Sequence, residues 1–159
     1  MFFKSFTISI ILFFAFTASV HAGITSEEAR KVVEYYYTGK GGGGVFMKAD
    51  YCKEIIKDGP DKNNCSNKAG QKNFSLDEEV YAWGSFLVPK GDEDTFYVEF
   101  KNMGITWQTS PLKVKEGFRY RTWTKQKFDK KGVWTITFKK IDKKKGESIV
   151  LKEFQVKVR

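Results

Sequence analysis

Histidine is almost absent from this sequence, which contains one, His21, among 159 residues. We expect His21 to lie in an amino-terminal segment that is removed, so the mature chain would contain none. Its absence excludes Ser-His-Asp and Cys-His nucleophile systems, histidine-ligated zinc and histidine general bases. We also assign no catalytic residue from the sequence and expect no cofactor or metal site in the mature protein.

The chain also lacks a long apolar run. Its longest, residues 6–16, follows one cation, Lys4, and is shorter than the ~20 residues that span a bilayer. A basic start, a short apolar core and small residues before Gly23 are typical of a secretory signal peptide. We expect residues 1–22 to be a signal peptide cleaved after Ala22, which favours a secreted or periplasmic protein over a membrane anchor.

Cysteine is scarce, with only Cys52 and Cys65 present. In an oxidising compartment two such residues are expected to pair, and they close a short loop. The spacing is far longer than Cys-x-x-Cys, so a structural disulfide is favoured over a redox pair.

Helical signals occupy the first part of the mature chain. Thr25 stands three residues before Glu28, the spacing of a capping box, and apolar residues follow at helical intervals. These features predict a helix over 26–37, a flexible glycine connector over 41–44 and a second short helix over 50–57. The glycine string lacks the Gly-Lys-Ser/Thr ending of a phosphate-binding loop.

From residue 78 onward the hydrophobic period changes to two. Trp134, Ile136 and Phe138, for example, share one face of an expected strand, and turn residues at 129–132 and 142–146 predict hairpins. The pattern predicts a mainly β, antiparallel Ig-like β-sandwich over 76–159, preceded by a helical, disulfide-closed segment over 23–75. The expected strands are 79–88, 95–101, 105–109, 118–128, 133–141 and 149–158.

Four short stretches of this half resemble a family of small bacterial β-sandwich domains of unknown function. They are Phe86-Leu87-Val88-Pro89, Arg119-Tyr120-Arg121-Thr122-Trp123, Gly132-Val133-Trp134-Thr135-Ile136 and Phe154-Gln155-Val156. The resemblance covers about residues 78–159 and implies an Ig-like architecture, secretion or membrane tethering, and no catalytic activity.

Positive charge is concentrated in the carboxyl-terminal half. The chain has 28 basic and 19 acidic residues, a formal net charge of +9. Residues 113–159 hold 16 basic and 5 acidic side chains, whereas residues 23–112 hold 11 basic and 14 acidic ones. This asymmetry predicts an anionic partner for the second half, and export favours envelope polymers, acidic glycans or anionic lipid head groups over nucleic acid. The alternative is that the lysines in the predicted turns serve only to keep the protein soluble.

One expected strand, 118–128, combines cations with an aromatic ring. Period two places its candidate ligand-binding residues on one solvent-facing side: Arg119, Arg121, Trp123, Lys125 and Lys127. A tryptophan among cations suits a sugar ring that carries carboxylate or phosphate groups. The alternative is a bulge near Thr122 that turns Trp123 into the core, which the family resemblance favours.

Three functions remain open at this point. The first is a secreted, non-enzymatic interaction domain that binds a protein or a cell-envelope component. The second is a binder of acidic glycans or anionic lipid head groups through the basic strand. The third is a small carboxylate-dependent hydrolase, although acids such as Asp92, Glu93 and Asp94 lie adjacent in a turn and do not predict an opposed pair or a calcium loop. Asn64 and Asn73 each begin an Asn-x-Ser glycosylation triplet.

Overall fold

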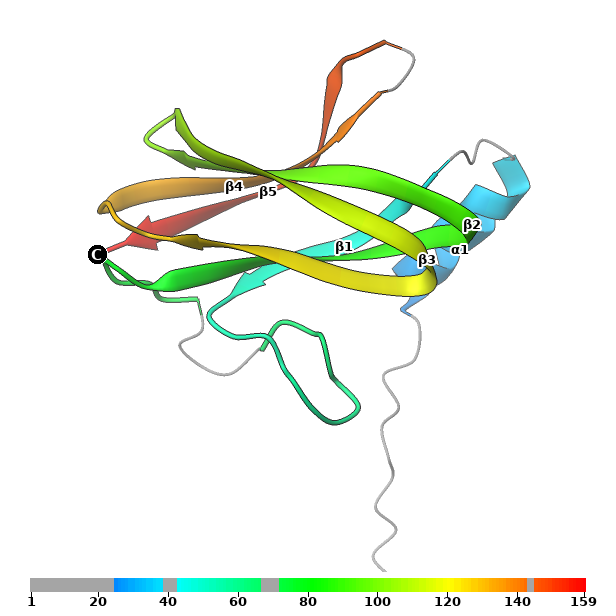
Figure 1. Ribbon diagram of the computed structural model, residues 1–159, viewed down its shortest axis with the longest axis horizontal. Helices are drawn as coiled ribbons and strands as arrows, with labels where there is room; N and C mark the ends of the chain where they lie inside the picture. Colours follow the sequence, from blue (N-terminus) through cyan, green and yellow to red (C-terminus); the bar gives the residue numbers. More distant parts are fainter. Residues whose placement is uncertain (1–24, 39–42, 67–71, 143–144) are drawn as a thin grey trace, which may run out of the picture.

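The computed structural model describes residues 25–38, 43–66, 72–142 and 145–159, and the expected signal peptide lies outside these ranges (Figure 1). The described chain is mainly β, as predicted. No helix within it has the length and apolar composition needed to cross a bilayer. Its elements are α1 (Ser26–Thr38), β1 (Val45–Cys52), β2 (Glu79–Asn102), β3 (Ile105–Lys127), β4 (Gly132–Ile141) and β5 (Ser148–Val158).

The first helix begins where the capping box predicted. The backbone N–H of Thr25 donates to Glu28 Oε2 at 2.9 Å, and the N–H of Glu28 donates to Thr25 Oγ1 at 3.2 Å. These reciprocal bonds satisfy two amide groups that have no partner inside the helix. The prediction of a helix from Ser26 is confirmed.

The predicted second helix over 50–57 is wrong, because Asp50, Tyr51 and Cys52 belong to strand β1. They pair with Trp83, Ala82 and Tyr81 of β2. Tyr51 packs against the main core, whereas Cys52 is buried in a separate cluster on the other face of the sheet. The helical spacing of these residues did not decide their structure, because pairing with β2 satisfies their backbone groups instead.

Two pairs of predicted strands are each one continuous strand. The expected strands 79–88 and 95–101 are both parts of β2, and 105–109 and 118–128 are both parts of β3. The two elements pair in both halves of their length, with register shifts after Phe86, between Val88 and Glu93, and after Phe100; residues 89–92 have no partner in the register. A tight turn joins them at Met103 and Gly104, both of which have positive φ, as a type I′ turn requires.

The strands form a single antiparallel sheet that curls into a half-barrel, so the predicted Ig-like sandwich is not confirmed. The first half of β2 pairs with β1 and the second half pairs with β4, while β3 follows the other side of both halves. The 129–132 turn therefore connects β3 to β4 across the sheet and does not form the predicted hairpin. The 142–146 hairpin is confirmed, with Gly146 N–H donating to Asp142 O at 2.7 Å.

One hydrophobic core fills the concave side of the curled sheet. Phe86 and Phe96 come from opposite halves of β2, and their ring centroids lie 4.4 Å apart. Trp134 of β4 is fully buried among them, as its strand face predicted. The core belongs to both halves of the sheet at once.

The expected flexible connector is close-packed where it is described. Gly44 is buried, and a Cβ atom there would lie 3.1 Å from the Phe96 ring and 3.3 Å from Val88. Its N–H donates to Asp94 Oδ2 at 2.9 Å. A side chain at Gly43 or Gly44 would therefore meet side chains of β2, and residues 41–42 lie outside the described part.

Candidate functional site

The basic strand keeps the alternation that its sequence predicted. From Glu79–Lys127 to Phe86–Tyr120, β2 and β3 pair without a register shift. The alternative of a bulge that buries Trp123 is therefore wrong, and Trp123 is 36% exposed. The convex face of this part of β3 carries all five predicted residues: Arg119, Arg121, Trp123, Lys125 and Lys127.

Three of the four predicted cations on that face are neutralised by carboxylates of this chain. Arg119 pairs with Glu28 of α1 at 3.2 Å, Lys125 with Glu79 at 2.8 Å and Lys127 with Asp77 at 2.8 Å. Burial raises the pKa of Glu28, but hydrogen bonds from Thr25 and the charge of Arg119 outweigh it and lower this pKa overall. Three cations of the strand are thus engaged in ion pairs within the protein and are less available to a ligand.

Arg121 binds the loop between Cys52 and Cys65, which folds over the convex face of β3. Its guanidinium donates to the carbonyl oxygen of Lys62 at 2.9 Å. Burial, followed by repulsion from Arg119, lowers the pKa of Arg121, although Asp61 and Glu28 act in the opposite direction. Arg121 lies on the predicted face, but it is half-buried and its guanidinium is bonded to the loop that contains Lys62.

The predicted disulfide between Cys52 and Cys65 is present and closes this loop, residues 53–64. Inside it, Ile56 N–H donates to Asn64 O at 2.9 Å, and Asn63 N–H donates to Ile56 O at 2.8 Å. The indole N–H of Trp83 on β2 donates to Asn63 O at 2.6 Å. A small apolar cluster lies beneath the loop and attaches it to the sheet: Cys52, Ile55, Cys65 and Trp83.

A pocket of about 420 Å³ lies between this loop and the sheet. Trp123 and Tyr81 line it from neighbouring strands, and Ile55 and Ile56 line it from the loop. We call it the Trp123 pocket. It offers an aromatic surface next to a wall whose position is set by a disulfide and backbone hydrogen bonds.

Lysines of the loop supply the charge of the Trp123 pocket. Lys53, Lys57 and Lys62 line it, together with one carboxylate, Glu54. Lys53 pairs with Glu78 at 2.8 Å. The ammonium groups of Lys57 and Lys62 form no ion pair with a described residue, and both side chains are exposed. They are the cations that remain for an anionic ligand.

Sequence reasoning therefore identified the aromatic residue of the pocket and missed its charges. Tyr81 was also missed, although strand periodicity could have identified it, because it lies two residues before Trp83 and therefore on the same face of β2. Nothing local to Lys57 or Lys62 indicated that their loop folds over β3, because that depends on which face of β1 carries Cys52.

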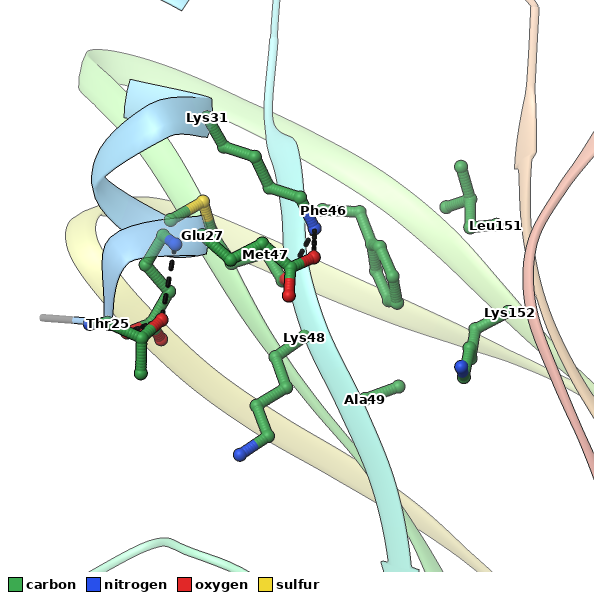
Figure 2. A pocket seen from close by; sticks show the side chains of 10 residues that line it. Thr25, Glu27, Lys31, Phe46, Met47, Lys48, Ala49, Leu151 and Lys152 are labelled. Atoms are coloured by element: carbon green, nitrogen blue, oxygen red, sulfur yellow. Dashed lines mark hydrogen bonds and ion pairs between the residues drawn. The ribbon is translucent and has the colours of Figure 1, made fainter. Parts of the chain in front are cut away.

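A second hollow of about 480 Å³ lies between α1, β1 and β5 (Figure 2). Lys31 occupies it, donating to Met47 O at 2.8 Å and pairing with Glu27 at 3.1 Å. Its ammonium also lies 5.9 Å from the Phe46 ring centroid. The aromatic surface and the central cation of this hollow are thus already in contact with each other.

The prediction that Asp92, Glu93 and Asp94 lie in a turn is wrong, because all three belong to strand β2, and Asp94 is buried. Asp94 accepts from Gly44 N–H, and its carboxylate pairs with Lys140 at 2.8 Å. Among the described residues no group of three or more His, Cys, Asp or Glu side chains is arranged to hold a metal ion.

No protein family matches the sequence, and no curated protein does. A solved structure, that of the C-terminal domain of wzt, is similar with a TM-score of 0.43 and 9% identity over 75% of each chain. This similarity is too low to support a functional conclusion. The resemblance to small bacterial Ig-like domains is not confirmed.

Proposed function

We propose that this protein is an exported, non-enzymatic binding domain, and that its ligand is an acidic saccharide of the cell envelope held in the Trp123 pocket. The observation that carries the proposal is that the exposed indole of Trp123 lines one pocket with Lys57 and Lys62, whose ammonium groups form no ion pair with a described residue. An aromatic face packs against the apolar face of a sugar ring, and ammonium groups bind its carboxylates or phosphates.

Binding is favoured over hydrolysis by the acids of the pocket. Glycoside hydrolysis generally uses two carboxyl groups on opposite sides of the scissile bond. The lining of the Trp123 pocket includes a single carboxylate, that of Glu54. The disulfide supports the export part of the proposal, since such bonds persist in oxidising compartments.

The test is a binding titration of the mature protein with polygalacturonate, an acidic polysaccharide, and with neutral dextran. We expect binding to polygalacturonate alone, and weaker binding as salt rises, because screening acts on exposed charges. Trp123→Ala should reduce affinity about tenfold or more. The Lys57→Gln/Lys62→Gln double variant should lose a similar amount and most of the salt dependence.

Lys125→Gln is the matched control, since Lys125 is exposed on the same strand but pairs with Glu79. It should bind as the parent does. Urea unfolding should show that Trp123→Ala costs no more than about 2 kcal/mol, because the ring is only partly covered. Equal binding by the parent and all variants, or no preference for the acidic polymer, would eliminate the pocket as the site.

A further inference from the structure

The end of the sheet that carries the β2–β3 turn presents apolar side chains to solvent. Met103 is 78% exposed and Ile105 is 68% exposed, and Trp107 and Leu76 are each 39% exposed. These four residues, here called the tip patch, line one hollow of about 560 Å³. Figure 1 shows that the β2–β3 turn, the start of β4 and the carboxyl terminus lie at this same end.

The patch is held in place by the structure beneath it. Met103 N–H donates to Val133 O at 3.1 Å, which ties the turn to β4. The Trp107 ring contacts the buried Trp134 ring edge to face, with centroids 6.0 Å apart. Because Trp134 belongs to the core, the exposed side chains point outward from a fixed base.

Cations border the patch. Lys130 and Lys131 line the same hollow, together with one acid, Asp129. The ammonium of Lys130 lies 4.6 Å from the centroid of the Trp107 ring. The two aliphatic side chains, Met103 and Ile105, are more exposed than the Trp107 indole, and the lysine ammonium groups lie at the border. Such a surface is apolar at its centre and positive at its rim.

We propose that the tip patch docks on an anionic lipid bilayer. Met103 and Ile105 enter the boundary between head groups and acyl chains, Trp107 lies at the head-group level, and Lys130 and Lys131 contact lipid phosphates. Tryptophan favours this interface because its ring is apolar and its N–H is polar. Lysines near the surface add attraction to anionic lipids.

The size of the patch favours a membrane over a second copy or another protein. A stable protein interface takes about 20–30 residues from each side. The tip patch has four apolar residues: three belong to the β2–β3 hairpin, and Leu76 belongs to the segment before β2. Shallow insertion needs only such a small group when charge attraction assists it.

The experiment is flotation of the mature protein with two kinds of vesicle. One consists of phosphatidylcholine alone, and the other contains about one-third phosphatidylglycerol, which is anionic. We expect the parent to float with the anionic vesicles only. Ile105→Glu should reduce the bound fraction about tenfold or more, because it places a charge where an apolar group enters the lipid. Lys130→Glu should also weaken binding.

Ile149→Glu is the matched control, because Ile149 is an exposed isoleucine, 47% accessible, on strand β5. This variant and Trp123→Ala should float as the parent does, which separates this surface from the Trp123 pocket. The proposal is overturned if the parent floats with neither vesicle or equally with both, or if Ile149→Glu loses binding as Ile105→Glu does. A parent that dimerises in sedimentation velocity through Ile105, without binding lipid, would overturn it in favour of a second copy.

Discussion

Asp94 is the residue whose surroundings best show how charge is used inside this fold. Its carboxylate accepts from the N–H groups of Thr95 and Gly44 and pairs with the Lys140 ammonium. Burial by itself raises the pKa of Asp94, but Lys140 and the two amides outweigh it, so the pKa is lowered overall. One side chain thus links β2 to β4 and to the segment that enters β1.

The lowered pKa predicts an acid-dependent contribution to stability. A carboxyl group whose pKa is lower when folded stabilises the fold above its unfolded pKa, about 3.9 for Asp, and loses this effect as pH falls through the folded value. We therefore expect Asp94→Asn to be less stable than the parent at neutral pH by about 1–3 kcal/mol. The difference should shrink as pH falls below about 3.9 and through the lower folded pKa, where the parent group becomes protonated too.

Urea unfolding at a series of pH values measures this difference. Asp58→Asn is the control, because Asp58 is exposed in the disulfide loop. Its difference from the parent should be small throughout. If the cost of Asp94→Asn did not change with pH, the charge of Asp94 would not be what stabilises this contact.

At the scale of elements, β1 pairs with β2 alone among the described strands, and lysines bind carbonyl oxygens of β1 and of the residue before it. Lys140, Lys31 and Lys72 donate to the carbonyl oxygens of Gly44, Met47 and Tyr51, at 2.8, 2.8 and 2.6 Å. An unprotected edge strand invites pairing with another chain, and lysine is a common protection. Three lysines of the chain thus occupy acceptor groups that an added strand would need.

The disulfide loop is the element on which the candidate site depends. Cys52→Ser removes a crosslink between residues 13 apart in sequence, which the chain-entropy model values at ~3 kcal/mol. We expect a melting temperature lower by about 5–10 °C. The affinity of the Trp123 pocket for its ligand should fall as well, because the loop supplies Lys57 and Lys62.

Thermal melts with and without reductant check this prediction. The reduced parent should melt like Cys52→Ser, and both should bind polygalacturonate less tightly than the oxidised parent. Detection of two free thiols in unreduced, denatured protein would show that the crosslink does not form in solution.

At the scale of the whole molecule, both halves of the curled sheet share one hydrophobic core. Phe46 of β1 lies 6.0 Å from Phe138 of β4, and Tyr51 of β1 lies 5.2 Å from Phe154 of β5, measured between ring centroids. These rings meet across the concave side although their strands do not pair. Neither half of the sheet has an apolar core of its own.

Trp134→Ala should therefore destabilise the whole fold and not one half of it. Trp134 is fully buried and its indole N–H donates to Lys130 O at 2.8 Å. Truncation of a buried aromatic side chain costs about 3–5 kcal/mol. Far-ultraviolet circular dichroism and tryptophan fluorescence should report the same, lower urea midpoint. Two separate transitions would mean that the halves fold independently.

Local features of the sequence determined several parts of this protein. The capping box placed the start of α1, two cysteines specified one crosslink, and period two assigned Trp134 to the core and Trp123 to the opposite face. Each of these depends on near neighbours in the chain or on one pairing choice. The expected signal peptide, export and ligand class remain predictions.

Only the tertiary structure decided how long the strands are and where the loop after β1 lies. Residues 50–57 carry helical spacing, yet Asp50 and Cys52 form a strand because β2 offers backbone partners. The strand signal is weak between Val88 and Glu93, so the sequence predicted two strands where there is one bent strand. The bend follows from packing both halves of the sheet around one core. Lys57 and Lys62 line the same pocket as Trp123 for the same reason: the positions of distant segments are set by pairing and burial, which no local pattern records.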